Sequence, residues 1–458
     1  MATSVESVRT SSPVVGQGSD MMEKQQKGEQ VSPTLQDSET IASSELPAPA
    51  AAAATPPPPP DGGLMAWLQV LGAFFLFFNS WGIVNSFGSF QAHYEQVLIP
   101  DKSPSAISWI GSFQGFLLFI VSVFVGPIFD KGYLKTIIVI GLFLVVFGLM
   151  MTSLSTQYYQ LFLAQGVVTG CGLAFNVLPS VAIIATYFSK RRALAVGITA
   201  SGGSIGSVLY PIMLRKTIGP LGFGWATRLM AFIALGTLLI PLAVMRSRLP
   251  PPTKFRALYD MTMFREPPSV AMCFAMVFCF LGIYFPLFYL PTFYAVKLQE
   301  PGDMSFYVLS ILNATSLIGR LGAGAIGDNI GPINTVLPFS FASAVVAFAW
   351  MGIHNVGGTI VFAVIYGITS GAMVSVSLTL VAALSPSLSV VGTRMGMNFI
   401  FAGVGLLIGN PIAGALIDLE NRVFWKAQLF SAVTLVVSFL GIVVIRITRG
   451  RELTGWKM

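Results

Sequence analysis

Residues 134–154 read LKTIIVIGLFLVVFGLMMTSL, a nearly unbroken apolar run. A helix crosses the hydrocarbon core of a bilayer with about 20 such residues, because each residue adds about 1.5 Å to a span of about 30 Å. The chain is therefore predicted to be an all-α membrane protein with twelve transmembrane helices. The other eleven runs lie at 67–90, 107–129, 159–186, 193–214, 226–245, 269–293, 305–327, 335–353, 358–384, 395–417 and 426–446.

The composition excludes a water-soluble globule and indicates a lipid bilayer as the surroundings. Hydrophobic residues make up 54% of the chain and charged residues 10%, whereas soluble domains carry about 25% charged residues. The net charge of +7 does not indicate nucleic-acid binding, since the basic residues lie in short connections between apolar runs. Of the 26 lysines and arginines, 18 fall on the side of the N-terminal tail, which predicts that both termini are cytoplasmic.

A polar segment divides the apolar runs into two sets of six. It carries three consecutive prolines from Pro250, so a continuous helix cannot pass through it. The first sixty residues are polar and then rich in alanine and proline, a composition that favours disorder. The predicted organisation is a disordered cytoplasmic tail at 1–60, an N-terminal six-helix bundle at 61–245, a cytoplasmic inter-bundle loop at 246–268, a C-terminal six-helix bundle at 269–446 and a cytoplasmic C-terminal tail at 447–458.

A short motif follows the second apolar run and recurs after the eighth. Gly126, Asp130 and Lys131 precede the third span, and Gly324 and Asp328 occupy the equivalent place 198 residues later. This spacing predicts two related six-helix units. A carboxylate at a helix end can bind a neighbouring helix N-terminus or a cation in one conformation and release it in another, or it can be an ordinary interfacial acid.

The pattern at 126–130, with the cations after it, resembles the signature of the major facilitator superfamily. Two segments are similar to the monocarboxylate-transporter-like branch, the monocarboxylate porter family: Asp61-Gly62-Gly63 and residues 187–197, which read YFSKRRALAVG. Residues 85–91, NSFGSFQ, resemble fungal members of that branch. The candidate gating residues are Gly126, Asp130, Lys131, Asp328, Lys190, Arg191 and Arg192.

This resemblance implies the major facilitator fold, with two bundles related by pseudo-two-fold symmetry, and a function without a cofactor. The expected function is secondary transport of a small organic solute, monocarboxylate-like or another organic acid, by alternating access. The plasma membrane is the expected location. Uptake and efflux stay open, because the same cycle runs in either direction.

Arg320 is the most informative single residue, because it lies inside an apolar run. A guanidinium there costs about 2.5–3.5 kcal/mol on insertion scales, so it is expected to face a polar cavity. Asn313 and Ser316 lie on the same helical face by their spacing, which suits an anionic or polar substrate, although Arg320 could instead bind backbone carbonyls. The substrate-binding candidates are Arg320, Asn313, Ser316, Asn85, Asn79, Asn176, Tyr284 and Asn398.

The acidic residues predict weak pH dependence. All twelve acids outside the tail fall in predicted loops or at span ends, so no carboxylate is expected at the membrane midplane. External pH is therefore expected to change flux only modestly.

The same residues leave two other functions open. A carrier that exports a fungal secondary metabolite is the alternative within transport, and a non-transporting membrane nutrient sensor is the alternative outside it. An enzyme is not expected, because the spans contain no midplane carboxylate pair, no metal-ligand cluster and no nucleophile beside a histidine. The sequence indicates a small-molecule substrate and no particular protein partner.

Overall fold

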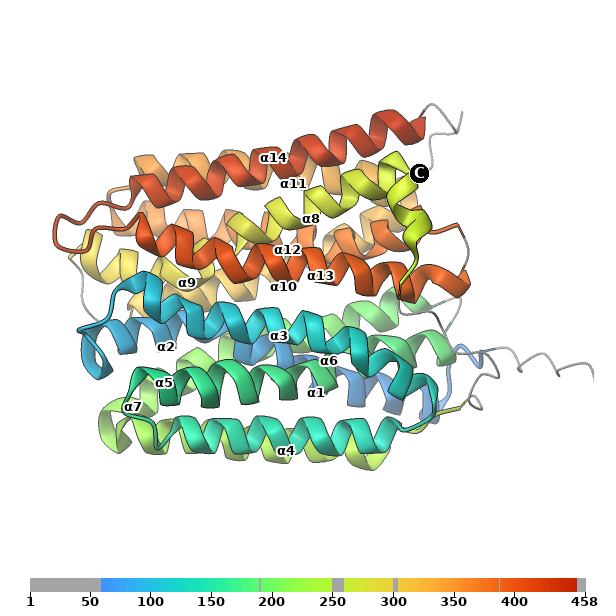
Figure 1. Cartoon of the computed structure of the whole chain (residues 1–458), viewed down its shortest axis with the longest axis horizontal. Coiled ribbons are helices and arrows are strands. Elements are labelled where there is room, and N and C mark those ends of the chain that lie inside the picture. The colour runs from blue at the N-terminus through green and yellow to red at the C-terminus, as the bar shows by residue number, and fades with distance from the viewer. Residues whose placement is uncertain (1–58, 189–190, 249–258, 300–303, 387, 451–458) are drawn as a thin grey trace, which may run out of the picture. The chain divides into compact units, whose positions relative to one another are not determined.

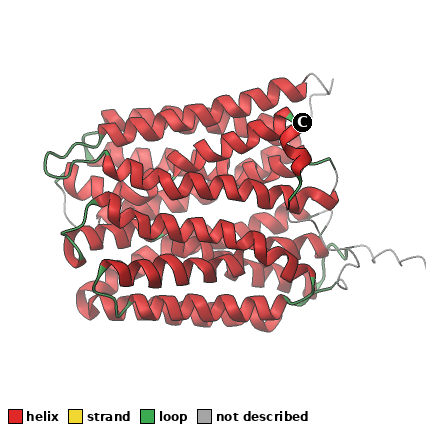
Figure 2. Cartoon of the chain, in the orientation of Figure 1, coloured by secondary structure: helices red, strands yellow, loops and turns green. Residues whose placement is uncertain are grey.

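The computed structural model describes residues 59–188, 191–248, 259–299, 304–386 and 388–450. For residues 130, 192, 193, 306, 328, 378, 388–390 and 450 it describes the backbone alone. Secondary structure in these ranges is helical, apart from one isolated antiparallel bridge between Asp418 and Val423 (Figure 2). Eleven of the described helices are long and apolar enough to cross a bilayer.

The N-terminal half starts with a long segment in three parts. α1 (Leu64–Asn85) is followed after Ser86 by α2 (Phe87–His93) and by the π-helical η1 (Tyr94–Leu98). The predicted end of this span at residue 90 was therefore eight residues short. The remaining elements of this half are α3 (Pro104–Asp130), α4 (Leu134–Thr152), α5 (Tyr158–Leu161), η2 (Phe162–Thr169), α6 (Gly170–Tyr187) and α7 (Arg192–Val244).

The C-terminal half repeats this opening arrangement. α8 (Pro267–Ile283) is followed after Tyr284 by α9 (Phe285–Thr292) and by the π-helical η4 (Phe293–Lys297). The same sequence of elements at the start of both halves supports an internal repeat. The other elements are η3 (Met261–Arg265), α10 (Met304–Ile330), α11 (Pro332–Ala349), η5 (Trp350–Gly352), α12 (Val356–Leu384), α13 (Leu388–Ala415) and α14 (Trp425–Gly450).

α7 accounts for the difference between eleven helices and twelve predicted spans. Its 53 residues would extend about 80 Å as one straight helix, far more than a bilayer is thick. Gly222 interrupts it with φ 75° and ψ 164°. The Asn79 side-chain oxygen accepts hydrogen bonds from Tyr210 at 2.6 Å and from Thr237 at 3.2 Å, so the segments before and after Gly222 both lie beside α1. α7 is two antiparallel spans.

The two halves pack against each other chiefly along three helix pairs, α3 with α13, α7 with α10 and α2 with α9. Figure 1 draws the helices of the N-terminal half, in blue and green, beside those of the C-terminal half, in yellow to red. The ring of Phe119 lies 5.3 Å from that of Phe280 and 5.2 Å from that of Phe399, measured between centroids. The bundle limits at 61–245, 246–268 and 269–446 stay predictions, and η3 falls inside the predicted loop.

Candidate functional site

A cavity of about 30 Å³ lies between helices of the two halves. Its floor and walls come from α1, the break between α8 and α9, the middle of α10 and the middle of α12. Five of the predicted site residues line it, and its eleven lining residues include no carboxylate. The lining residues are Asn85, Ile283, Tyr284, Leu287, Leu312, Asn313, Ser316, Arg320, Ser370, Gly371 and Val374.

Arg320 supplies the cation of this cavity. Its Nε atom is buried and has no hydrogen-bond partner among the residues that the structure describes. Tyr284, which is 4% exposed, lines the same cavity from the helix break. A buried guanidinium nitrogen without a partner is costly, so this arrangement can bind an anionic or hydrogen-bond-accepting group.

Asn85 and Ser316 connect the cavity to α7. The Asn85 amide nitrogen donates to the Ser207 hydroxyl at 3.0 Å, while its buried side-chain oxygen has no partner in the described ranges. Ser316 donates to the Asn313 carbonyl at 2.7 Å, and its hydroxyl lies 3.4 Å from that of Ser204 in the other half. The cavity therefore lies where α1, α7 and α10 meet.

Three predicted site residues lie away from this cavity. Asn79 is held by Tyr210 and Thr237 and ties α1 to both spans of α7. Asn176 is fully buried, and its side chain has no hydrogen-bond partner within the described part of the chain. Asn398 donates to the Arg394 carbonyl at 2.9 Å and lines a separate, smaller cavity.

Sequence reasoning missed the contribution of α12. Ser370, Gly371 and Val374 line the cavity, yet none of them is charged and all lie in an apolar run. The small polar residues Thr369 and Ser370 are the only local signal. Gly371 leaves little room for a side chain, because an added Cβ would lie 2.4–2.9 Å from Ser316 atoms.

The structure joins the two segments that carried the family resemblance. The Asp61 N–H donates to the Tyr187 carbonyl at 3.1 Å, and the rings of Trp67 and Phe188 lie 5.2 Å apart. The Tyr187 hydroxyl in turn donates to the Arg246 carbonyl at 3.1 Å. The start of α1, the end of α6 and the end of α7 are thus tied together on one face.

The predicted gating residues are described only in part. Lys190 lies outside the described residues, as do the side chains of Asp130, Arg192 and Asp328. Lys131 and Arg191 are exposed. An added Cβ at Gly126 would meet only Leu178, at 3.7 Å, so close helix approach does not require a glycine there in this conformation.

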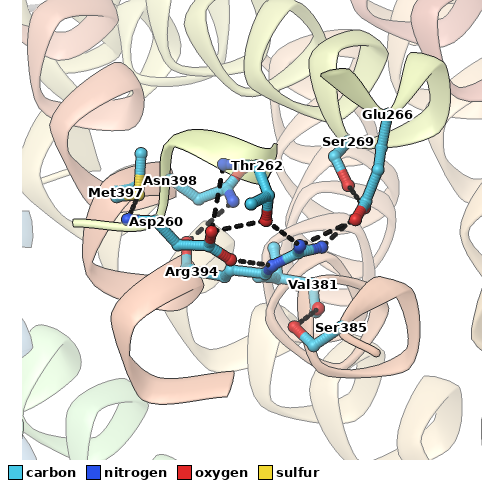
Figure 3. Close-up of polar contacts among 9 residues, drawn as sticks. All are labelled: Asp260, Thr262, Glu266, Ser269, Val381, Ser385, Arg394, Met397 and Asn398. Carbon is cyan, nitrogen blue, oxygen red and sulfur yellow. Dashed lines mark hydrogen bonds and ion pairs between the residues drawn. The ribbon is translucent and has the colours of Figure 1, made fainter. Parts of the chain in front are cut away.

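A second polar cluster, unexpected from the sequence, surrounds Arg394 at the start of α13. Figure 3 shows its guanidinium between two acids, Asp260 and Glu266. The Arg394 Nε lies 2.9 Å from the Asp260 carboxylate, and its Nη1 and Nη2 atoms lie 2.6 and 2.8 Å from the two oxygens of Glu266. The Arg394 side chain is only 3% exposed, so these contacts compensate a buried charge.

The electrostatics of this cluster keep both acids ionised. The pKa of Asp260 is lowered by hydrogen bonds from Thr262 first and then from Arg394. The pKa of Glu266 is lowered chiefly by its hydrogen bonds from Arg394. Asp260 and Glu266 lie in the predicted inter-bundle loop, whereas Arg394 lies in the predicted connection before the run at 395–417. Because 134 positions separate Asp260 from Arg394, no local pattern could join them.

A helical membrane protein whose two halves enclose a polar cavity has the architecture of a secondary transporter. The family model described as Major Facilitator Superfamily matches residues 64–360, and the chain belongs to this family. The predicted fold class is confirmed, and the protein is a non-enzymatic, multi-pass membrane carrier of small molecules.

Similar proteins come from fungi. The chain is 44% identical to MFS-type transporter dbaD of Emericella nidulans over 80% of this chain and 82% of the relative. It is 39% identical to the aspyridones efflux protein apdF of the same organism, over 81% and 76%, and 36% identical to the agnestins efflux protein AgnL12 of Paecilomyces divaricatus, over 85% and 88%. A crystal structure of a mutant nucleoside transporter, NupG, shares the fold, with a TM-score of 0.64, 15% identity and coverage of 82% of this chain and 99% of that one.

Proposed function

We propose that this carrier exports a fungal secondary metabolite and that an acidic or strongly polar group of the metabolite binds Arg320. Relatives named for the efflux of aspyridones and agnestins support the direction of transport. The position of Arg320 on the inter-helix cavity, with an unpartnered Nε, carries the proposal for the substrate group. We also propose that the chain belongs to the monocarboxylate porter branch, on the motifs at 61–63 and 187–197.

The size of the cavity bears on how such a substrate enters. A volume of about 30 Å³ holds roughly two water molecules, whereas sites for drug-sized ligands measure about 300–1,000 Å³. Binding therefore requires the two halves to separate around Arg320, as alternating access demands. The excess of basic residues on the side of the N-terminal tail favours cytoplasmic termini. We place the carrier in the plasma membrane, where export removes the metabolite from the cell.

A comparison of metabolites inside and outside cells tests direction and substrate together. Cells that contain the carrier are compared with cells from which it has been deleted, by untargeted mass spectrometry of cell extract and medium. We expect one acidic metabolite or a small set to accumulate inside the deletion cells and to fall in the medium. Accumulation in the medium of the deletion cells would instead make the protein an uptake carrier.

Substitution of Arg320 tests the binding residue. Arg320→Ala is expected to lower export about tenfold or more, because the loss of a hydrogen bond to a charged group costs roughly 1.5–3 kcal/mol. Arg320→Lys keeps the positive charge but lacks the planar guanidinium that can donate two parallel hydrogen bonds, so it should retain part of the flux. Arg228→Ala is the matched control, since that guanidinium lies over Trp225, 4.9 Å from the ring centroid, and bonds Ser153. Wild-type export by Arg320→Ala would remove Arg320 from the site.

A further inference from the structure

One carboxylate bridges the two halves at the end of the molecule opposite the start of α1. The Glu95 Oε1 atom accepts a hydrogen bond from the Gln91 amide at 2.8 Å, one helical turn earlier. Its Oε2 atom accepts one from the Thr292 hydroxyl at 2.9 Å. Gln91 belongs to α2 of the N-terminal half and Thr292 to α9 of the C-terminal half, so Glu95 joins helices that move apart when this face opens.

The packing around Glu95 closes this face. An added Cβ at Gly88 on α2 would overlap the Leu287 carbonyl oxygen on α9, and the rings of Phe87 and Phe288 lie 4.9 Å apart. Figure 1 shows α2 and α9 at the same end of the helices, opposite the C-terminus. A carrier that opens toward this side has to separate α2 from α9 and break the bond between Glu95 and Thr292.

The charge of Glu95 is not matched by a cation in the described chain, where it forms no ion pair within 4 Å. Tyr94 and Tyr289 donate their hydroxyls elsewhere, to Gln165 and to the Pro104 carbonyl. Glu95 is half-buried, so solvent on this face can supply a proton. The titratable or charged residues on this segment and in the turn after it are His93, Tyr94, Asp101 and Lys102. Among those on the elements that contact α2 or α9 are Tyr289 on α9, Tyr294 and Lys297 on η4, and Arg215, Lys216 and Arg228 on α7.

We propose that Glu95 is a proton-binding site that couples opening of this face to pH. Opening returns the carboxylate to water, whereas closing surrounds it with neutral donors and apolar side chains. A carboxylate takes up a proton more readily where water is removed and no cation replaces it. The closed arrangement therefore binds the proton more tightly, and by linkage protonation favours closure while deprotonation favours opening.

This coupling gives the carrier a way to use a proton gradient. If the face is extracellular, as the basic-residue bias predicts, an acidic medium protonates Glu95 after substrate release and favours closure toward the outside. The inference rests on the carrier function but on no particular substrate. It differs from the modest pH dependence of flux that the sequence predicts. That prediction placed Glu95 in a loop, because the apolar run ends at residue 90, whereas the helical segment continues through Glu95.

A thiol reporter tests the coupling without substrate. Leu287→Cys places the thiol on α9, at the wall of the inter-helix cavity and next to the contact with α2, where Leu287 is 8% exposed. Its alkylation by a water-soluble maleimide is read by mass spectrometry on the purified full-length protein in detergent. The rate is measured from about pH 5 to about pH 8, across the range in which a buried carboxylate can titrate. The same reporter in Glu95→Gln, which imitates the protonated acid, corrects for the pH dependence of the thiol itself.

We expect the rate with Glu95, divided by the rate with Glu95→Gln, to rise severalfold as the pH rises. A ratio that stays constant would overturn the proposal and leave Glu95 a structural residue. Thr292→Val supplies a second readout, because it removes the donor from the other half and keeps the acid. We expect that variant to open more at high pH and to retain its pH dependence, whereas equal opening at every pH would also contradict the proposal.

Discussion

At the scale of single residues, the buried ion pairs of Arg394 make a specific prediction about stability. The double variant Asp260→Asn with Glu266→Gln leaves the guanidinium buried without a counter-charge, and we expect it to lower the free energy of unfolding by about 3 kcal/mol. Thermal unfolding of the purified protein at neutral pH measures the effect. Asp101→Asn is the matched control, because Asp101 pairs with Lys102 in an exposed turn, where solvent screening leaves an ion pair little effect on stability.

The same cluster predicts a pH dependence with a definite sign. Because the pKa values of Asp260 and Glu266 are lowered in the folded protein, both acids contribute stability above the unfolded values, 3.8 and 4.5. This contribution is lost as the pH falls below those values through the lower folded ones. The melting temperature of the wild type should therefore approach that of the double variant in acid. A constant difference between the two at all pH values would contradict the assignment.

The sequence could identify Arg320 but not Arg394, and the reason is physical. Arg320 is the only charged residue in its apolar run, so the free-energy cost of placing it in the membrane is enough to identify it as a candidate site residue. Arg394 lies at the end of a predicted span, where inserting a cation costs little free energy. In the sequence it therefore looks like any other basic residue at the membrane interface. Its partners Asp260 and Glu266 become neighbours only when the inter-bundle segment folds back onto α13, which no local spacing records.

At the scale of helices, the glycines of α7 show how closely it packs against α1. Gly202 and Gly206 lie against the backbone of α1, where an added Cβ would overlap the carbonyl oxygens of Phe74 and Phe78. Gly197, by contrast, lies beside Leu321 of α10. Small residues at three- and four-residue spacing predict a close helix contact, but they do not name the partner helix.

This contact predicts a difference between two glycines of the same helix. Gly206→Ala forces α7 away from α1 and should lower stability by about 1–3 kcal/mol, the usual cost of overpacking. Gly236→Ala should have no such cost, because an added Cβ there meets nothing within 4 Å. The melting temperatures of the two variants in detergent measure the difference. Equal melting temperatures would show that α1 and α7 can separate without loss.

Helix boundaries were predictable where apolar runs end abruptly and unpredictable where a helix continues in polar residues. The runs at 134–154 and 358–384 lie within two residues of α4 and α12. The first span continues through His93 and Glu95 because these side chains contact neighbouring helices: the His93 ring stacks on Phe223, and Glu95 accepts a hydrogen bond from Thr292. Tertiary contact, which the local pattern does not contain, therefore decided where that helix ends.

At the scale of the whole molecule, transport requires the two halves to change their contact. α7 and α10 meet at Ser204 and Ser316, whose hydroxyl oxygens lie 3.4 Å apart across the halves. Cysteine sulfurs that take the place of these hydroxyl oxygens need only a small adjustment to reach the S–S length of about 2.0 Å. The variant Ser204→Cys with Ser316→Cys should therefore fix the halves together on oxidation.

We expect oxidation of this double variant to stop export and a reductant to restore it, because the bond holds α7 against α10 while alternating access moves one half against the other. Export is measured in cells or vesicles before and after each treatment. The flux of each single cysteine variant should not change on oxidation. Ser438→Cys is the matched control, since it can bridge to the native Cys279 within the C-terminal half, where Ser438 contacts that thiol. Full export by the cross-linked α7 and α10 pair would mean that transport proceeds without relative movement of the halves at this point, and the rocking mechanism would have to be abandoned.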